Sequence, residues 1–253
     1  ILLYLPPARG NPFQSLLYRQ SYKYGIGPVP VLSLADVDGF RWPDRTIVHL
    51  HWTRQITQAA ESADDAETAA DVAIEVLSRS GARGNALVWT VHNVLPHECR
   101  FPEADIRLRR WLAANADVVH VLAASTPELV TPSYELPSDG RLVHVPHPSY
   151  VGVYPDHISA DDARWELGLE PHHHVAVVVG SQRAHKGVDV LVRALGTLGD
   201  DWRVLVAGDP VTEVDRAALA AMAADEPRLI VCPRRVGIEE MQLFHRAADL
   251  LSL

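Results

Sequence analysis

Short apolar runs alternate with longer amphipathic stretches through the first 150 residues of the chain. Each run has the length of a buried strand, and the stretches between runs repeat their apolar residues every three or four positions, as helices do. This alternation is typical of a parallel sheet with helices on both faces. The predicted strands are 1–5, 28–32, 46–51, 86–91, 116–123 and 142–145, and the predicted helices are 13–24, 59–80 ending at Gly81, 103–114 and one starting near Ser125.

The same pattern begins again after a connection at 149–157 that contains glycine and proline. A short helix is expected over 159–167, and a second alternation of strands and helices follows it. Those strands are 175–179, 202–207, 229–232 and one from residue 250 onward, and those helices are 188–198, 212–224 and 238–247. The sequence therefore predicts an α/β protein with two Rossmann-like, doubly wound parallel sheets, in domains 1–150 and 151–253, of which the second is incomplete.

Composition narrows the class of protein further. Hydrophobic residues make up 47% of the chain and charged residues 22%, which is globular composition and excludes a largely disordered chain. The formal charge of −9 disfavours general nucleic-acid binding, because such a surface repels phosphate backbones. The two cysteines lie far apart and form no disulfide framework, and no apolar run reaches the ~18 residues that span a bilayer. These features predict a cytoplasmic protein.

The strongest chemical signal is the loop after the apolar run 175–179. Gly180 ends the run, Arg183 and Lys186 lie three residues apart in the loop, and a helix begins near Gly187. Ligands bind at the carboxyl ends of parallel strands, where a helix N-terminus presents free N–H groups and partial positive charge. A guanidinium and an ammonium added to that position predict a diphosphate site, although the loop matches neither the Walker nor the dinucleotide fingerprint. A solvated turn with two ordinary surface cations stays the alternative.

A second signal is a group of histidines at predicted strand ends. They lack helical ligand spacing and an accompanying cysteine cluster, which argues against a zinc site. Histidine, asparagine and tryptophan together offer hydrogen bonds and an apolar face, so a polar cleft for a sugar is the better hypothesis. Ordinary, partly buried histidines that cap strands are the alternative. The histidines are His49, His51, His92, His97 and His147.

Several segments resemble the GT-B glycosyltransferases, especially family 4 and its bacterial relatives. The segment 180–187 resembles their donor loop, although many members place arginine directly after the glycine, where this chain has Ser181. Trp89-Thr-Val-His92-Asn93 resembles the strand end whose histidine lines the catalytic cleft. The loop 8–11 resembles the one that closes over the donor phosphates, and 164–169 resembles the Arg-x-x-Leu-Gly-Leu helix. The order of segments agrees over nearly the whole chain.

The resemblance implies a hexosyltransferase that moves a sugar from a nucleotide-diphosphate donor to a hydroxyl acceptor, retaining and metal-independent, with no cofactor. The acceptor would be a carbohydrate or a lipid-linked sugar of bacterial polysaccharide biosynthesis, with no nucleic-acid partner. Peripheral contact with the cytoplasmic face of a membrane, through the arginines of helix 103–114, stays open. The implied catalytic residues are His92, Arg183 and Lys186; the implied donor-binding residues are Gly10, Asn11, Gly180, Arg183, Lys186, Gly187, Asp209 and Arg234; the implied acceptor-binding residues are His51, Trp52 and Asn93.

One family motif falls outside the sequence. The Glu-x7-Glu carboxylates that hold the donor sugar and ribose in the family would lie beyond Leu253, so the resemblance implies truncation before that motif. Two alternatives stay open beside a transferase. One is a GT-B sugar-nucleotide epimerase, which would act on the nucleotide sugar without an acceptor. The other is an inactive fragment that binds a nucleotide sugar or a carbohydrate.

Overall fold

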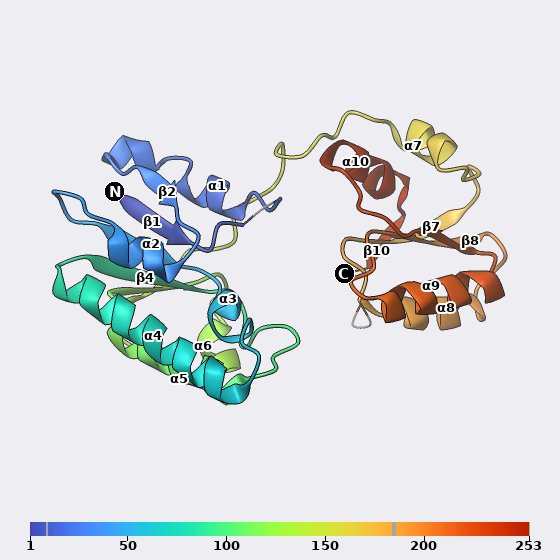
Figure 1. Cartoon of the computed structure of the whole chain (residues 1–253). Helices are drawn as coiled ribbons and strands as arrows, with labels where there is room; N and C mark the ends of the chain where they lie inside the picture. The colour runs from blue at the N-terminus through green and yellow to red at the C-terminus, as the bar shows by residue number, and fades with distance from the viewer. Residues whose placement is uncertain (9, 184–185, 253) are drawn as a thin grey trace. The chain divides into compact units, whose positions relative to one another are not determined.

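The computed structural model describes residues 1–8, 10–183 and 186–252. The chain divides into two compact units, Ile1–Ser149 and Tyr150–Leu253 (Figure 1). The division lies beside the domain limit that the sequence predicts at residue 150. Each unit has its own sheet and its own apolar core, so each is described by itself.

The first unit is built on a six-stranded sheet in which every paired strand is parallel, in the order β2-β1-β3-β4-β5-β6. Every predicted strand of this unit is present, with ends shifted by up to two residues. The register places Thr90 directly beside His120, so two polar side chains are neighbours inside an otherwise apolar sheet. The strands are β1 (Leu2–Leu5), β2 (Pro28–Pro30), β3 (Ile47–Leu50), β4 (Ala86–Val91), β5 (Val118–Val121) and β6 (Leu142–His144).

Helices cover both faces of this sheet. Figure 1 shows α4 and α5 side by side on one face and α1 on the other. Trp89, Leu108 and Leu112 are fully buried between β4 and α5, in the largest apolar cluster of the unit. The helices are α1 (Phe13–Tyr18), α2 (Leu34–Gly39), α3 (Arg54–Thr57), α4 (Ala63–Ala82), α5 (Pro102–Asn115) and α6 (Thr126–Val130), with a 3-10 turn η1 (Ser21–Tyr24).

Four helices of this unit differ from the predictions, and one of them is α3, which was not predicted. The predicted helix 13–24 ends at Tyr18 and continues only as the separate turn η1. Helix α4 runs through Gly81, and the left-handed residue that follows it is Gly84, with φ +83°. Helix α2 was not predicted, although its N-terminal signal is present: the Ser33 and Asp36 side chains form a capping box.

The second unit has a four-stranded parallel sheet in the order β10-β7-β8-β9. Its strands are β7 (His174–Val179), β8 (Trp202–Ala207), β9 (Leu229–Cys232) and β10 (Leu250–Ser252), and its helices are α7 (Ala160–Glu166), α8 (Val188–Leu195), α9 (Glu213–Asp225) and α10 (Ile238–Ala247). These agree with the predicted elements to within one residue, except that α8 ends at Leu195, three residues early.

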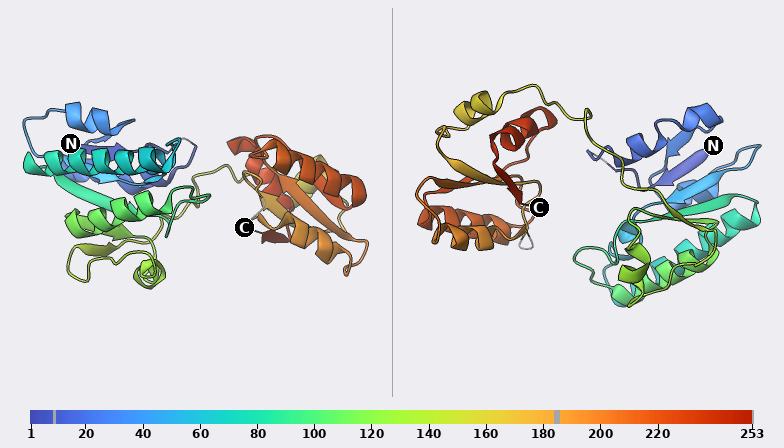
Figure 2. Two further views of the ribbon diagram at one scale, coloured as in Figure 1. Left: turned by 60° about the horizontal axis from the view of Figure 1, so that its bottom comes forward. Right: turned by 180° about the vertical axis from the view of Figure 1, so that it is seen from behind.

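Strand β7 is buried on both faces, as its continuous apolar sequence predicts. Val175 and Val177 pack with Phe244 of α10 on one face. On the other face of the strand, Ala176 and Val178 pack against helices α8 and α9. Figure 2 shows the same two helix layers around this sheet from two further directions. Among the helices in the described part of the chain, none has the length and hydropathy needed to cross a bilayer.

Candidate functional site

Three of the predicted site residues lie together at the carboxyl edge of the first sheet. The rings of Trp52 and His92 stack with centroids 4.2 Å apart and 21° between their planes. His51 lies next to both, with its centroid 5.3 Å from that of His92. Phe13 approaches His92 edge-on at 5.0 Å and also contacts His147. These contacts make one aromatic surface from α1 and from the segments after β3 and β4.

His51 has a different place from the one predicted. It is 2% exposed, and its two ring nitrogens bond to Tyr18 and to His92, so neither nitrogen can contact an acceptor directly. Trp52 and His92 are half-buried and keep accessible surface. Burial, more than the neighbouring histidines, lowers the pKa of His92 to about 3, so this imidazole is neutral at pH 7.

Three polar residues that contact this histidine group were not predicted. They are Tyr18, Thr90 and His120, all buried, and their hydrogen bonds link β3, β4 and β5 to α1. A sequence signal for two of them exists. Thr90 is the polar position within the apolar run 86–91, and His120 interrupts the valine-rich run 118–121, and a buried polar side chain needs a partner.

The loop after β1 is held by Gln14 of α1. The buried side chain of Gln14 donates to the Pro6 carbonyl at 2.9 Å and accepts from the Ala8 N–H at 2.7 Å. Asn11 accepts from the Phe13 N–H at 2.9 Å, which starts α1, and Gly10 has a φ of +78° that favours glycine. Arg9, which is part of the resemblance to the family, lies outside the described residues. The predicted donor-binding residues Gly10 and Asn11 therefore lie directly before the start of α1.

A buried arginine fixes the segment after His92. The guanidinium of Arg109 donates to the Asn93 carbonyl at 2.7 Å and to Thr53 Oγ1 at 2.9 Å. It also forms an ion pair with Asp105, which accepts a further bond from Thr57. The predicted acceptor residue Asn93 is thus tied through its backbone.

Two of the three arginines of α5, the helix for which membrane contact stays a prediction, are held in ion pairs. Arg109 is 4% exposed and is fully engaged in the cluster just described. Arg107 pairs with Glu67 at 3.0 Å and with Asp71. The sequence of this helix could not reveal that Arg109 is buried, because an arginine contributes the same residue to the sequence whether its side chain is buried or exposed.

In the second unit, the predicted donor loop follows β7. Gly180 has a φ of +110°, and Gly187 has a φ of +66° and is the N-cap of α8. The Lys186 N–H donates to the Arg183 carbonyl at 2.9 Å, so the backbones of the two cationic residues lie close together. The structure records no ion pair for the Lys186 ammonium within the described residues. A helix N-terminus with two cationic residues in the preceding turn is suited to bind an anion.

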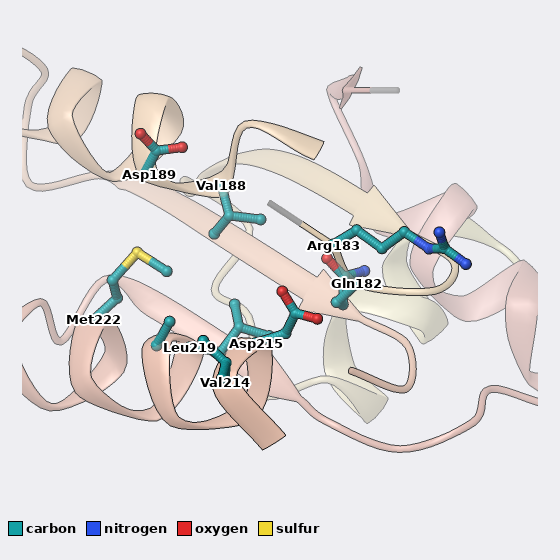
Figure 3. Close-up of a pocket in the computed structure, with 9 residues that line it drawn as sticks. Gln182, Arg183, Val188, Asp189, Val214, Asp215, Leu219 and Met222 are labelled. Carbon is teal, nitrogen blue, oxygen red and sulfur yellow. The ribbon is translucent and has the colours of Figure 1, made fainter. Parts of the chain in front are cut away.

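A pocket of about 380 Å³ lies beside this loop, between α8 and α9 (Figure 3). Gln182 is 1% exposed, and its Nε2 donates to the Gly180 carbonyl at 2.7 Å. Its Oε1 has no hydrogen-bond partner among the described residues. A buried acceptor without a donor is costly to the fold. The pocket is lined by Gln182, Arg183, Val188, Asp189, Val214, Asp215, Ala218, Leu219 and Met222.

The two other donor residues predicted in this unit are already in ion pairs. Asp209 follows β8 and contacts Arg216 at 3.2 Å. Arg234 follows β9 and its Nη1 donates to Glu240 at 2.8 Å. Both residues lie at the same sheet edge as the donor loop, but a ligand would have to share or displace their partners. In the described ranges, no group of three or more histidine, cysteine, aspartate or glutamate side chains has the arrangement of a metal site.

Gly208 brings the ends of β7 and β8 into contact, so Gly208→Ala is expected to destabilise this unit by about 3 kcal/mol. Its φ is +145°, and an added Cβ would lie 1.8 Å from the Gly180 carbonyl oxygen. Urea unfolding of both variants measures the effect. The matched control is Gly237→Ala, because Gly237 has a φ of −72° and open space around a Cβ. Equal unfolding midpoints for the two variants would contradict the expected clash.

Comparison with known proteins gives the fold and no family. No protein-family model matches the sequence. No curated protein shows a significant match. Among solved structures, the Anabaena protein HepE in complex with UDP has 16% identity and a TM-score of 0.63, over 99% of this chain and 72% of that one. WaaG, a glycosyltransferase involved in lipopolysaccharide biosynthesis, has 14% identity and a TM-score of 0.59, over 99% and 74% of the chains.

A third similar structure has a different described activity. It is a putative UDP-N-acetylglucosamine 2-epimerase from Listeria monocytogenes, with 8% identity and a TM-score of 0.56, over 99% of this chain and 72% of that chain. Identities this low establish architecture and no shared activity. The two parallel sheets, their helix layers and these likenesses together give the chain the GT-B fold.

Proposed function

We propose that this chain belongs to a glycosyltransferase that moves a sugar from a nucleotide-diphosphate donor to a hydroxyl acceptor. The observation that carries the proposal is the turn that places Arg183 and Lys186 directly before the N-terminus of α8. A departing nucleoside diphosphate is an anion, and such a turn offers it a guanidinium, an ammonium and free N–H groups. HepE has been seen with UDP and with UDP-glucose, which supports a uridine nucleotide as the donor.

The proposed chemistry uses positive charge where negative charge develops. As the bond between the sugar and the diphosphate breaks, charge accumulates on the phosphate oxygens, and Arg183 and Lys186 stabilise it more strongly in the transition state than in the ground state. We therefore propose transfer without a metal ion. Retention of configuration is proposed because no aspartate stands directly after β1, β3, β4 or β5 to act as the base for inversion.

The aromatic surface of the first unit is proposed to position the sugar and the acceptor. Trp52 and His92 are half-buried and stacked, so they offer a flat apolar face with an imidazole nitrogen at its side. The part that WaaG has in lipopolysaccharide biosynthesis supports a carbohydrate or lipid-linked acceptor. We further propose that the enzyme is a bacterial hexosyltransferase and that it acts in the cytoplasm.

His92→Ala in the full chain is expected to lower kcat about 100-fold, because the sugar loses a positioning contact at the reacting centre. The fold should survive, since the ring is half-buried and lies at the edge of the sheet. Steady-state kinetics and Trp fluorescence measure the two effects. The control is His172→Ala, an exposed histidine of the second unit. Loss of folding together with activity would make His92 a core residue instead.

The test of the proposed function is an assay of the full protein with radiolabelled UDP-glucose, with and without an oligosaccharide acceptor. A transferase moves the label to the acceptor and leaves the nucleotide sugar unchanged when no acceptor is present. The epimerase alternative, favoured by the likeness to the Listeria structure, predicts a changed nucleotide sugar without any acceptor. Binding of the nucleotide sugar with no conversion in either case would point to a non-catalytic binding protein.

A further inference from the structure

Polar side chains at the carboxyl edge of the first sheet form one continuous chain of hydrogen bonds. It begins at the half-buried His92 and ends at a backbone carbonyl beyond β6. Every side chain between these ends is buried. The bonds join His92 Nε2 to His51 Nδ1 (3.1 Å), His51 Nε2 to the Tyr18 hydroxyl (2.6 Å), that hydroxyl to His49 Nδ1 (2.8 Å), His49 Nε2 to Thr90 Oγ1 (2.7 Å), Thr90 Oγ1 to His120 Nδ1 (2.9 Å), and His120 Nε2 to the Val145 carbonyl (2.9 Å).

The carbonyl end sets the direction of the first links. A carbonyl oxygen only accepts, so His120 carries its proton on Nε2 and, when neutral, has a lone pair on Nδ1. Thr90 must then donate its single hydroxyl proton to that lone pair. Having no other proton to give, Thr90 Oγ1 accepts from His49, which places the proton of His49 on Nε2.

The remaining hydrogen bonds, from His49 to His92, have the same direction. With its proton on Nε2, His49 accepts at Nδ1 from the Tyr18 hydroxyl. Tyr18 has then used its proton and accepts from His51 Nε2. His51 in turn has a lone pair on Nδ1, which accepts from His92 Nε2. His92 is therefore left with a proton on Nε2 and a lone pair on Nδ1, for which the structure records no partner among the described residues.

These bond directions hold only if the side chains are uncharged, and burial keeps them uncharged. Burial lowers the pKa of His49 to about 3 and raises the pKa of Tyr18 above its usual range, so the imidazole and the phenol are both neutral at pH 7. The opposite direction of all the bonds would need protons on both nitrogens of His120. That would put a cation at a position only 5% exposed, where burial lowers the pKa of His120 and disfavours the charged form.

We propose that Tyr18, His49, Thr90 and His120 are positioning residues that hold His92 in a single neutral tautomer, with Nδ1 as a hydrogen-bond acceptor. A ligand at this surface must then present a donor to Nδ1, and a hydroxyl is the group that fits. This inference rests on the proposed function only in assigning that hydroxyl to the sugar donor or to the acceptor. The tautomer of His92 itself follows from the hydrogen bonds alone.

The test is ¹⁵N NMR of the full chain labelled at histidine, at pH 7 and without ligand. Nitrogen chemical shifts and couplings to ring protons distinguish the two tautomers, and single histidine substitutions assign the signals. We expect the Nε2–H tautomer alone at His49, His51, His92 and His120. A protonated Nδ1 at His92 would overturn the proposal.

Thr90→Val interrupts the chain at its middle with little change of shape. His49 then has no acceptor for its Nε2 proton, so the links from His49 to His92 are free to reverse. We expect the Nδ1–H tautomer of His92 to become detectable and kcat to fall about 10-fold, with KM for the nucleotide sugar unchanged within about two-fold. Thr90→Ser keeps the hydroxyl and should restore both.

The two readouts separate this inference from the proposed function. An unchanged His92 tautomer in Thr90→Val would overturn the inference, whatever the protein catalyses. The predicted tautomer in the native chain, its change in Thr90→Val and its recovery in Thr90→Ser, without any sugar transfer, would uphold the inference and reject the glycosyltransferase.

Discussion

Lys186→Ala in the full protein is expected to reduce kcat/KM for the nucleotide sugar about 100- to 1,000-fold, on the scale of ~3–4 kcal/mol in transition-state stabilisation. The ammonium has no ion-pair partner among the described residues, so its charge is available to a ligand. It stands next to the left-handed N-cap Gly187, at the positive end of the α8 dipole. Arg183→Ala should have a loss of the same order, because both cations stabilise the same leaving group.

The sequence offers a matched control for this result. Lys23 is the one other lysine of the 253 residues, and it is exposed in the first unit, where its ammonium donates to Gln20 Oε1 at 3.3 Å. Lys23→Ala should therefore leave kcat/KM within about two-fold of the native value. Steady-state kinetics with varied nucleotide sugar measure all three variants. Near-native kinetics in both Lys186→Ala and Arg183→Ala would remove the basis of the proposed function.

Arg109→Met should have the largest effect on stability, a loss of about 3–5 kcal/mol in the free energy of unfolding of the first unit. Asp105 is 0% exposed and forms its ion pair with this guanidinium. Removing the arginine leaves a buried carboxylate whose remaining side-chain hydrogen bond, among the described residues, comes from the Thr57 hydroxyl. It also releases the Asn93 carbonyl, which the arginine holds beside His92.

Urea unfolding followed through the buried Trp89 measures this loss. Arg107→Met on the same helix is the control, because its ion pairs are exposed and should contribute less than about 1 kcal/mol. The double variant Arg109→Met with Asp105→Leu should recover a large part of the stability, since no unpaired charge stays buried. Equal stability of Arg109→Met and Arg107→Met would show that the buried pair is not needed.

Much of the fold was predictable because its signals are local. An apolar run such as 175–179 can be stable only when both faces are covered, and so it identifies a central strand without reference to the rest of the chain. The position of the cationic segment before α8 was predictable for the same reason: glycine, cations and helix start lie within a few consecutive residues. Helices α2 and α3 escaped prediction because they are only six and four residues long, too short to show a helical period.

The sequence by itself determined the class of fold, the two alternations of strand and helix, and the position of the cationic turn at a strand end. Only the tertiary structure decided which polar residues act together. Tyr18 reaches His49 and His51 across 31 and 33 positions, and Arg109 reaches Thr53 across 56. The local pattern of apolar residues indicates that a strand is buried. The direction and the partner of a hydrogen bond depend instead on which strands and helices become neighbours. For that reason a sequence pattern marked His51 as a contact for the acceptor, whereas the packed sheet makes it an internal link behind His92.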